Sequence, residues 1–233
     1  MRGRLIVLEG SEGVGKSTQI EMLKEHLRAQ SIAFFSYREP GGTPFGDSLR
    51  RILLDPATSI SSRAEALLFM ASRAELVERE VVPKLSSGKL ILIDRFFLST
   101  YAYQIAGRLL PEQEVRLAND LARAGLIPDL TILLTAPSGE RQQRADLRGD
   151  RDRMEQAGDR FHERVERAFE SFLSPEWQQA HPECGPIVEV AATGAPHDVA
   201  ARVLAELERR VPETFTRRSE SLRNSGEGRR ADL

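Results

Sequence analysis

The chain has 233 residues, 40% hydrophobic and 29% charged, with a formal net charge of -2, which suits one large or two small α/β domains with a sizeable core. The charge gives no bulk attraction to nucleic acid or membranes, and apolar runs such as "LTILL" are too short to span a bilayer. With one cysteine, Cys184, no disulfide framework, and no signal-peptide pattern, we expect a cytoplasmic protein with no nucleic-acid or membrane partner.

Short apolar runs alternate with longer amphipathic stretches along the chain, which is typical of βα units around a parallel sheet. Predicted strands cover Leu5–Leu8, Ala33–Tyr37, Leu90–Ile93, Leu130–Leu134 and Ile187–Val190. Predicted helices cover Lys16–Ala29, Pro44–Leu53, Arg63–Leu85, Ser99–Ala106, Glu112–Ala124, Gly158–Leu173 and His197–Arg210. The fold class is therefore α/β, with a five-stranded parallel sheet flanked by helices.

The first predicted strand runs into a nucleotide phosphate-binding loop. The motif G-x-x-x-x-G-K-[ST] is complete and consists of Gly10, Ser11, Glu12, Gly13, Val14, Gly15, Lys16 and Ser17, followed by Thr18. Backbone N–H groups of such a loop and the N-terminus of the helix after it bind phosphate oxygens. The motif predicts a P-loop NTPase fold in which Lys16 binds the β- and γ-phosphates and Ser17 offers its hydroxyl to Mg²⁺.

A second feature of the nucleotide-binding side is "LILIDR", a predicted buried strand that ends in a carboxylate. Asp94 is expected to face the Mg²⁺–phosphate site. The next residue, Arg95, suits a kinase that holds two anionic substrates. A GTPase is disfavoured because the chain has no Asn-Lys-x-Asp motif and no Asp-x-x-Gly switch after the second strand.

Two segments depart from the βα pattern. Residues 141–160 are highly charged and almost without apolar side chains, so we expect a mobile, solvated stretch with a small lid at about 141–158. Residues 213–233 are polar, and we expect them to be a disordered tail after a single kinase domain spanning residues 1–212.

Three further stretches identify the acceptor. "REPGGTPFG" (38–46), "LLFMASRAELV" (67–77) and "DRFFLSTYAYQ" (94–104), together with "EGSEGVGKST", closely resemble the bacterial thymidylate kinases in order and spacing to about residue 210. The resemblance implies the reaction ATP + dTMP → ADP + dTDP with Mg²⁺, as part of dTTP biosynthesis. It also implies a homodimer packed through helices, although the sequence does not show which ones.

The resemblance assigns the acceptor residues. Phe69 and Arg73 are four residues apart and share a helix face; in the family pattern the phenylalanine stacks on thymine and the arginine hydrogen-bonds O4. The predicted substrate-binding set is Glu12, Arg38, Pro40, Arg50, Phe69, Arg73, Arg95, Ser99, Thr100, Tyr103 and Gln104.

Within this set the roles differ. The arginines Arg38, Arg50 and Arg95 are expected to hold the 5′-monophosphate, because two or three guanidiniums suit a dianion. Glu12 is expected to accept a hydrogen bond from the 3′-hydroxyl. The resemblance further implies that Thr100 and Gln104 read the N3 and O2 side of the base, and that Tyr103 crowds the ribose 2′ position.

The segment "RADLRGDRDRMEQ" resembles the family's lid. Some thymidylate kinases carry an arginine in the phosphate loop, but this loop has none, so the resemblance is to the subtype that acts through lid arginines. Arg153, supported by Arg148, is expected to contact the transferring phosphoryl group, with Arg151 the weaker candidate. The predicted catalytic residues are Lys16, Arg95, Arg148 and Arg153.

Two alternatives stay open at this point. The first is another P-loop nucleotide or deoxynucleoside kinase, such as one acting on dUMP, which lacks only the 5-methyl group of the base. The second is a regulatory P-loop protein that binds nucleotide without transferring phosphate. The intact Lys16, Asp94 and Arg95 disfavour the second.

Overall fold

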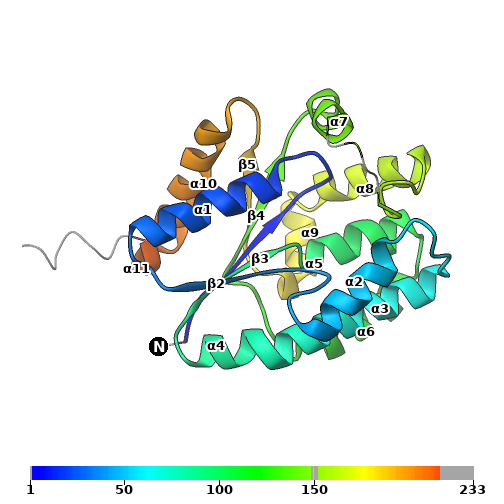
Figure 1. Cartoon of the computed structure of the whole chain (residues 1–233), viewed down its shortest axis with the longest axis horizontal. Helices are drawn as coiled ribbons and strands as arrows, with labels where there is room; N and C mark the ends of the chain where they lie inside the picture. Colours follow the sequence, from blue (N-terminus) through cyan, green and yellow to red (C-terminus); the bar gives the residue numbers. More distant parts are fainter. Residues whose placement is uncertain (1, 148, 150–151, 216–233) are drawn as a thin grey trace, which may run out of the picture.

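The structure, a computed structural model, describes residues 2–147, 149 and 152–215. Five strands form one parallel sheet in the order β2-β3-β1-β4-β5 (Figure 1). Their bounds are β1 (Leu5–Glu9), β2 (Phe34–Arg38), β3 (Leu90–Asp94), β4 (Leu130–Thr135) and β5 (Ile187–Ala191). The predicted five-stranded parallel sheet is confirmed.

Every strand ends one residue later than predicted. The extra residues are Glu9, Arg38, Asp94, Thr135 and Ala191. They continue the ladder in register: Arg38 is opposite Asp94 across β2 and β3, and Leu8 is opposite Asp94 across β1 and β3. Apolar runs predict the interiors of the strands, but the strands also include the residues that follow these runs at the carboxyl ends. Three of these residues, at the ends of β1, β2 and β3, place charged groups at one edge of the sheet.

Alternate residues of the strands supply two hydrophobic cores. Leu5 and Val7 of β1 point into one core, and Ile6 and Leu8 point into the other. The second core is covered by α1 (Lys16–Ala29), α10 (Pro196–Arg210) and α11 (Pro212–Phe215). The first is closed partly by α8 (Asp159–Ser171), whose Phe161, Val165 and Phe169 are buried at helical spacing, and by Phe172 directly after it.

The remaining elements complete the layers. They are α2 (Pro44–Leu54), α3 (Ser62–Leu76), the π-helical segment η1 (Val77–Val81), α4 (Val82–Ser86), α5 (Phe97–Thr100), the π-helical segment η2 (Tyr101–Gly107), α6 (Glu112–Arg123), α7 (Ser138–Asp146), α9 (Pro175–Ala180) and the 3₁₀ turn η3 (Pro182–Cys184). The single helix predicted for Arg63–Leu85 is thus three consecutive helical segments. Figure 1 shows α2, α3 and α6 lying together on the side away from α10.

Two segments contain secondary structure that composition does not predict. Residues 141–146 are the last six of the nine residues of α7, a helix with no buried residue. Residues 213–215 are not disordered but belong to α11, where Phe215 is buried in the core and Glu213 pairs with Arg4. The rest of the predicted tail lies outside the described residues.

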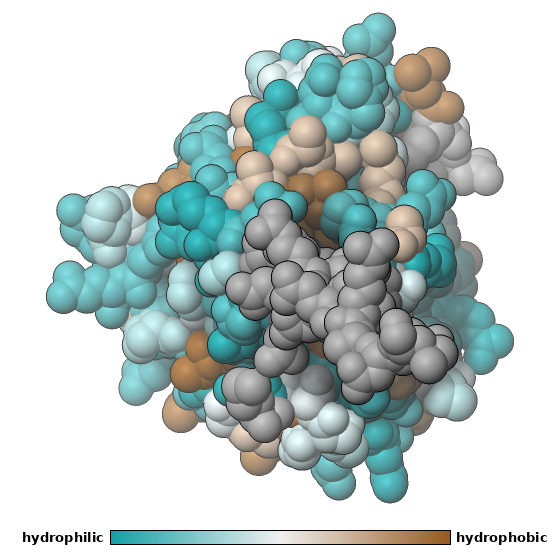
Figure 2. All heavy atoms as spheres, turned by 90° about the vertical axis from the view of Figure 1, so that its left-hand side faces the viewer, coloured by the Kyte–Doolittle hydropathy of each residue, from teal (hydrophilic) through white to brown (hydrophobic). Residues whose placement is uncertain are grey.

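Figure 2, which faces the left-hand side of Figure 1, shows mostly hydrophilic residues with small, separate hydrophobic ones where described residues form the surface. Across the described ranges, no helix combines the length and apolar character that crossing a bilayer requires.

Candidate active site

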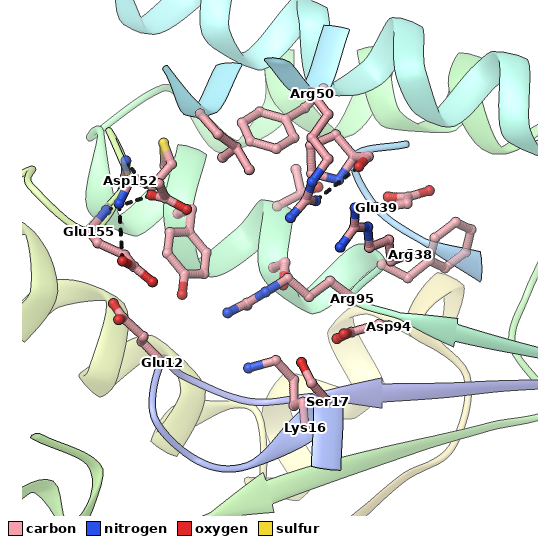
Figure 3. Close-up of a pocket in the computed structure, with 18 of the residues that line it drawn as sticks. Glu12, Lys16, Ser17, Arg38, Glu39, Arg50, Asp94, Arg95, Asp152 and Glu155 are labelled. Atoms are coloured by element: carbon pink, nitrogen blue, oxygen red, sulfur yellow. Dashed lines mark hydrogen bonds between the residues drawn. The ribbon is translucent and has the colours of Figure 1, made fainter. Parts of the chain in front are cut away.

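The phosphate loop joins the end of β1 to the start of α1. Gly15 has a φ of 96°, in the left-handed region that glycine tolerates, and α1 begins at the next residue. The N–H groups of the first helical turn have no partner within the helix and are available to an anion. Lys16 is buried, and its Nζ donates to the carbonyls of Gly10 at 2.8 Å and Ser11 at 2.7 Å. Lys16 and Ser17 reach from this loop into the pocket (Figure 3).

The loop packs directly against α7. Gly13 has a φ of 70°, and a Cβ built on it would lie 2.2 Å from the carbonyl oxygen of Arg141 in α7. Arg141 is itself fixed, because its Nε donates to Ala136 at 3.0 Å and its Nη2 pairs with Glu166 at 2.9 Å. A side chain at position 13 would therefore have to displace α7, and this position has no room for an arginine.

Asp94, the last residue of β3, carries an unsatisfied oxygen. Its Oδ1 is buried and hydrogen-bonds to none of the described residues. Ser17 lines the same pocket. The described ranges hold no cluster of three or more His, Cys, Asp or Glu that would form an all-protein metal cage. Magnesium usually binds through one or two protein oxygens, waters and substrate phosphates, so one carboxylate and one hydroxyl fit this ion.

Three arginines from different elements meet in the pocket. Arg38 ends β2, Arg50 lies on α2 and Arg95 follows β3, and Figure 3 shows their guanidiniums gathered in its centre. Arg50 is fixed by a hydrogen bond from its Nη1 to the carbonyl of Pro40 at 3.0 Å. Burial and then the charge of Arg38 lower the pKa of Arg50, although Asp152 and Asp94 oppose the shift. Such mutual repulsion is relieved when a dianion enters.

Arg95 connects the phosphate loop to the rest of the pocket. It has a φ of 66°, unusual for a residue with a side chain. Its Nη1 donates to the carbonyl of Gly10 at 3.2 Å and to Ser99 Oγ at 3.0 Å, and Ser99 Oγ in turn donates to the buried Glu9 at 2.7 Å. Burial lowers the pKa of Arg95, but the interactions with Tyr103, Glu9 and Asp94 outweigh it and the net shift is upward. Arg95 is therefore a fixed, charged link between the phosphate loop, through Gly10, and the Ser99 side of the pocket.

Arg73 is more deeply embedded than its predicted role requires. It is 2% exposed and donates to Glu39 through Nε, at 2.9 Å, and through Nη2. Its Nη1 donates to Thr100 Oγ1 at 2.8 Å and to Asn119 Oδ1 at 2.6 Å. Arg73 lines the pocket as predicted, but it is also the centre of a buried polar network that joins α3, α5, α6 and the loop after β2.

The other predicted base and sugar residues also lie in this pocket. Phe69 is partly buried beside the first core, while Thr100 and Gln104 are each 2% exposed. The ring of Tyr103 lies 5.1 Å from the Arg95 guanidinium carbon and packs against Phe161. These side chains form the inner wall of a cavity of about 490 Å³.

Carboxylates line the opposite wall. Glu12 of the phosphate loop and Asp152 and Glu155 of the segment before α8 lie together at one side of the pocket (Figure 3). Asp152 Oδ1 accepts from the N–H of Glu155 at 3.0 Å, and Glu155 Oε2 accepts from the N–H of Asp152 at 3.1 Å. This reciprocal pair has the hydrogen-bond pattern of a capping box, here around a turn, and gives the segment a defined local shape.

Only one of the three predicted lid arginines lies within the described residues. Arg148 and Arg151 lie outside the described residues. Arg153 is described, and its contacts differ from the predicted one: Nη1 pairs with the buried Glu65 at 2.7 Å, Nε donates to the carbonyl of Leu53 at 2.7 Å, and its own N–H donates to Leu54. Arg153 does not line the pocket. Its guanidinium is held by Glu65 and by Leu53 at the end of α2, so its contact with the phosphates stays a prediction that this arrangement does not favour.

The structure brings most of the predicted site together. The pocket is lined by Glu12, Gly13, Gly15, Lys16, Ser17, Thr18, Arg38, Pro40, Arg50, Phe69, Arg73, Asp94, Arg95, Ser99, Thr100, Tyr103 and Gln104. The loop residues Gly10, Ser11 and Val14 support it without lining it.

Sequence reasoning missed several charged or polar partners. Glu9 and Glu39 adjoin recognised motifs, and Glu65 lies four residues before Phe69 on the same helix face, so spacing could have indicated all three. Asn119 carries no such signal, whereas Arg144 is the first residue of the segment that resembles the lid, although the sequence analysis gives it no role. Arg144 of α7 lines the pocket on the phosphate-loop side and donates to Ala192 at 3.0 Å.

Comparisons with known proteins show which family the chain is similar to. The thymidylate kinase family model matches residues 8–182. A thymidylate kinase of Synechococcus sp. (strain JA-2-3B'a(2-13)) is 43% identical over 209 residues, covering 89% of this chain and 95% of the relative. One from Chlorobium chlorochromatii is 40% identical over 218 residues, covering 89% and 95%. One from Deinococcus radiodurans is 45% identical over 168 residues, covering 72% and 82%.

Proposed function

The chain belongs to the thymidylate kinase family and phosphorylates dTMP to dTDP, and we propose that this transfer takes place in the pocket between the phosphate loop and α3. The γ-phosphate of ATP lies against Lys16, and the 5′-phosphate of dTMP lies against the three arginines. One observation carries this assignment: two cationic sites line one cavity, and Arg95 contacts both the phosphate loop and the acceptor wall.

In the donor half, the residues present fit a magnesium–ATP complex. Lys16 and the N–H groups at the start of α1 bind the phosphates, while Ser17 and Asp94 hold the ion, directly or through water. The Oδ1 of Asp94, which is buried and hydrogen-bonds to no described residue, supports its part in this set. Bound magnesium neutralises charge that develops on the transferring group.

In the acceptor half, Arg38, Arg50 and Arg95 bind and orient the monophosphate so that its oxygen faces the γ-phosphate in line. Phe69 stacks on the base, and Tyr103 lies against the sugar. Glu12 accepts a hydrogen bond from the 3′-hydroxyl of dTMP. A carboxylate in a phosphate loop would repel the phosphates of ATP, but in this role it faces the acceptor nucleotide.

The Phe69→Ala variant tests this acceptor assignment. We expect the KM for dTMP to rise about 5- to 150-fold, since stacking of a base on an aromatic ring contributes about 1–3 kcal/mol, while the KM for ATP stays close to that of the parent. The measurement is steady-state kinetics with each substrate varied in turn.

The matched control is Phe35→Ala, at a partly exposed position of the edge strand β2. It should leave both KM values unchanged. If Phe69→Ala raised the KM values for ATP and dTMP equally, Phe69 would support the fold and not the base.

For the moving phosphoryl group, we propose that a lid arginine supplies a further positive charge. The packing of Gly13 against α7 leaves the phosphate loop without room for an arginine at that position. Because Glu65 and Leu53 hold Arg153 elsewhere, the proposal assigns this role to Arg148.

We also propose a homodimer formed through α3 and α6. These two helices pack together, and they carry Leu67 (61% exposed), Leu117 (65%) and Leu121 (85%). Exposed leucines on adjacent helices are typical of an interaction surface, and a second copy of the same face is the occupant that the family resemblance implies. Two-fold packing would bring the same leucines from both copies together.

The Leu121→Arg variant tests this interface. Light scattering after size-exclusion chromatography should show a dimer for the parent and a monomer for the variant, because burying an unpaired charge opposes association. Leu147→Arg, at an equally exposed leucine of the turn after α7, should remain dimeric. A Leu121→Arg variant that stays dimeric would place the interface elsewhere.

A further inference from the structure

Glu65 is a buried acid to which the roles above assign no part. Glu65 lies on α3, is 0% exposed, and is one helical turn before Phe69. Its Oε1 accepts from Gln104 Nε2 at 3.2 Å and from Arg108 Nε at 3.1 Å. Its Oε2 accepts from Arg108 Nη2 at 2.9 Å and from Arg153 Nη1 at 2.7 Å. A carboxylate that two guanidiniums neutralise and no solvent reaches is a fixed acceptor behind the base pocket.

This acceptor determines which way the Gln104 amide faces. A carboxylate can only accept hydrogen bonds, so the amide nitrogen of Gln104 must point toward Glu65. The amide oxygen then points away from Glu65. Gln104 lines the pocket, and within the described ranges no residue donates to its Oε1. The pocket wall therefore presents a hydrogen-bond acceptor at Gln104.

The neighbouring polar group has the opposite character. Thr100 Oγ1 already accepts a hydrogen bond from Arg73 Nη1. Its hydroxyl hydrogen is therefore available for a carbonyl, and Thr100 lines the same pocket four residues before Gln104. An acceptor beside a donor is complementary to an N–H beside a C=O, the imide edge of thymine or uracil. Cytosine presents an unprotonated N3 there, which would face the Gln104 oxygen without a hydrogen.

We propose that Glu65 is a positioning residue for base selection, which holds the Gln104 amide in the orientation that accepts an imide N–H and rejects cytosine. Glu65 does not touch the substrate itself. This inference rests on the proposed function, because it assumes that the base of the acceptor nucleotide lies against Gln104 and Thr100.

Arg153 and Arg108 keep Glu65 in the required form. Both donate to Oε2, and Arg153 is anchored by two further bonds to Leu53 and Leu54 at the end of α2. In a Glu65→Gln variant these two guanidiniums retain the amide oxygen at the Oε2 position. The new NH₂ group then faces Gln104, which must turn its own oxygen inward and its NH₂ toward the pocket. That orientation donates to cytosine N3 and opposes the N–H of thymine.

The test compares kcat/KM for dTMP and dCMP in the parent, Glu65→Gln, Gln104→Met and the double variant, with Glu78→Gln at an exposed site of η1 as a control. In Glu65→Gln the dTMP-to-dCMP ratio should fall at least about tenfold, the usual scale for a mispaired buried polar group, mainly through the KM for dTMP. Gln104→Met should lower the ratio as well. In the Gln104→Met background, Glu65→Gln should change the ratio by less than about twofold.

Two results would overturn the inference. One is an equal loss for both nucleotides in Glu65→Gln, which would indicate a purely structural role. The other is an undiminished effect of Glu65→Gln in the Gln104→Met background, which would show that Glu65 acts by another route. If the Glu65→Gln variant does not fold, the Gln104→Met variant alone decides. An unchanged dTMP-to-dCMP ratio of kcat/KM in that variant would overturn the inference, and a lowered ratio would support it. A parent enzyme that preferred another acceptor would instead refute the proposed function.

Discussion

Replacing Arg148 by alanine should lower kcat about a thousandfold, at the lower end of the ~10³–10⁵ range for a catalytic arginine in phosphoryl transfer. The KM for dTMP should stay within about threefold of the parent value, because an interaction made only in the transition state changes kcat and not ground-state binding. The phosphate loop cannot compensate, since Gly13 lies against the backbone of Arg141. The measurement is kcat under saturating ATP and dTMP.

The matched control is Arg153→Ala. Sequence analysis gives Arg153 the leading catalytic role, but its guanidinium pairs with Glu65. We therefore expect its loss to change kcat less than about tenfold and to act through the base side of the pocket. If Arg153→Ala lowered kcat as much as Arg148→Ala or more, the sequence-based ranking would be right and the structure-based one wrong.

Replacing Arg73 by methionine should destabilise the protein by about 3–5 kcal/mol, because it leaves a buried carboxylate without its partner. Glu39 is 5% exposed, and Arg73 is its only ion-pair partner within the described ranges. The free energy of unfolding is measured by urea denaturation. Arg79→Met, at a mostly exposed arginine of η1, is the control and should change it by less than about 0.5 kcal/mol.

The pH dependence of Arg73→Met has a defined sign. Burial raises the pKa of Glu39, and Arg73 opposes that shift in the parent. Without Arg73 the folded-state pKa rises further above the unfolded value. The variant should therefore regain stability relative to the parent below about pH 4.5 and lose it as the pH rises through the folded-state pKa. A destabilisation independent of pH would mean that Glu39 finds another partner.

Because Arg73 has a structural role, its variants are a poor probe of substrate binding. The spacing of Phe69 and Arg73 correctly indicates that both line one pocket. Spacing along one helix does not indicate that Arg73 also binds Glu39 and Asn119, 34 and 46 residues away. Kinetic losses in an Arg73 variant would mix binding with folding, so Phe69 is the cleaner test position.

Local sequence predicts the sheet and the donor half well for a physical reason. The strands are compact apolar runs, and the phosphate loop needs its glycines, lysine and serine in one contiguous stretch. Helix α7 was missed because it has no buried residue and so no apolar period. Arg141 and Arg144 attach it through hydrogen bonds to the carbonyls of Ala136 and Ala192.

The acceptor half is less readable because its geometry depends on contacts between distant segments. The motifs identify Thr100 and Gln104, but their hydrogen-bond directions are set by Arg73 and Glu65, 27 and 39 residues away. Composition alone predicts a disordered segment from residue 213, and it overlooks that a single aromatic residue, Phe215, anchors α11 in the core.

The most direct measurement is ADP release by the purified chain with Mg²⁺-ATP and, in parallel, dTMP, dUMP, dCMP, AMP and GMP. We expect the highest kcat/KM with dTMP. The value for dUMP should be lower by about 5- to 150-fold, because the missing methyl group is worth about 1–3 kcal/mol, and the values for dCMP and both purine nucleotides should be lower still. Faster turnover of a purine monophosphate or of dCMP than of dTMP, or no ADP release with any acceptor, would contradict the assignment of this pocket to thymidylate.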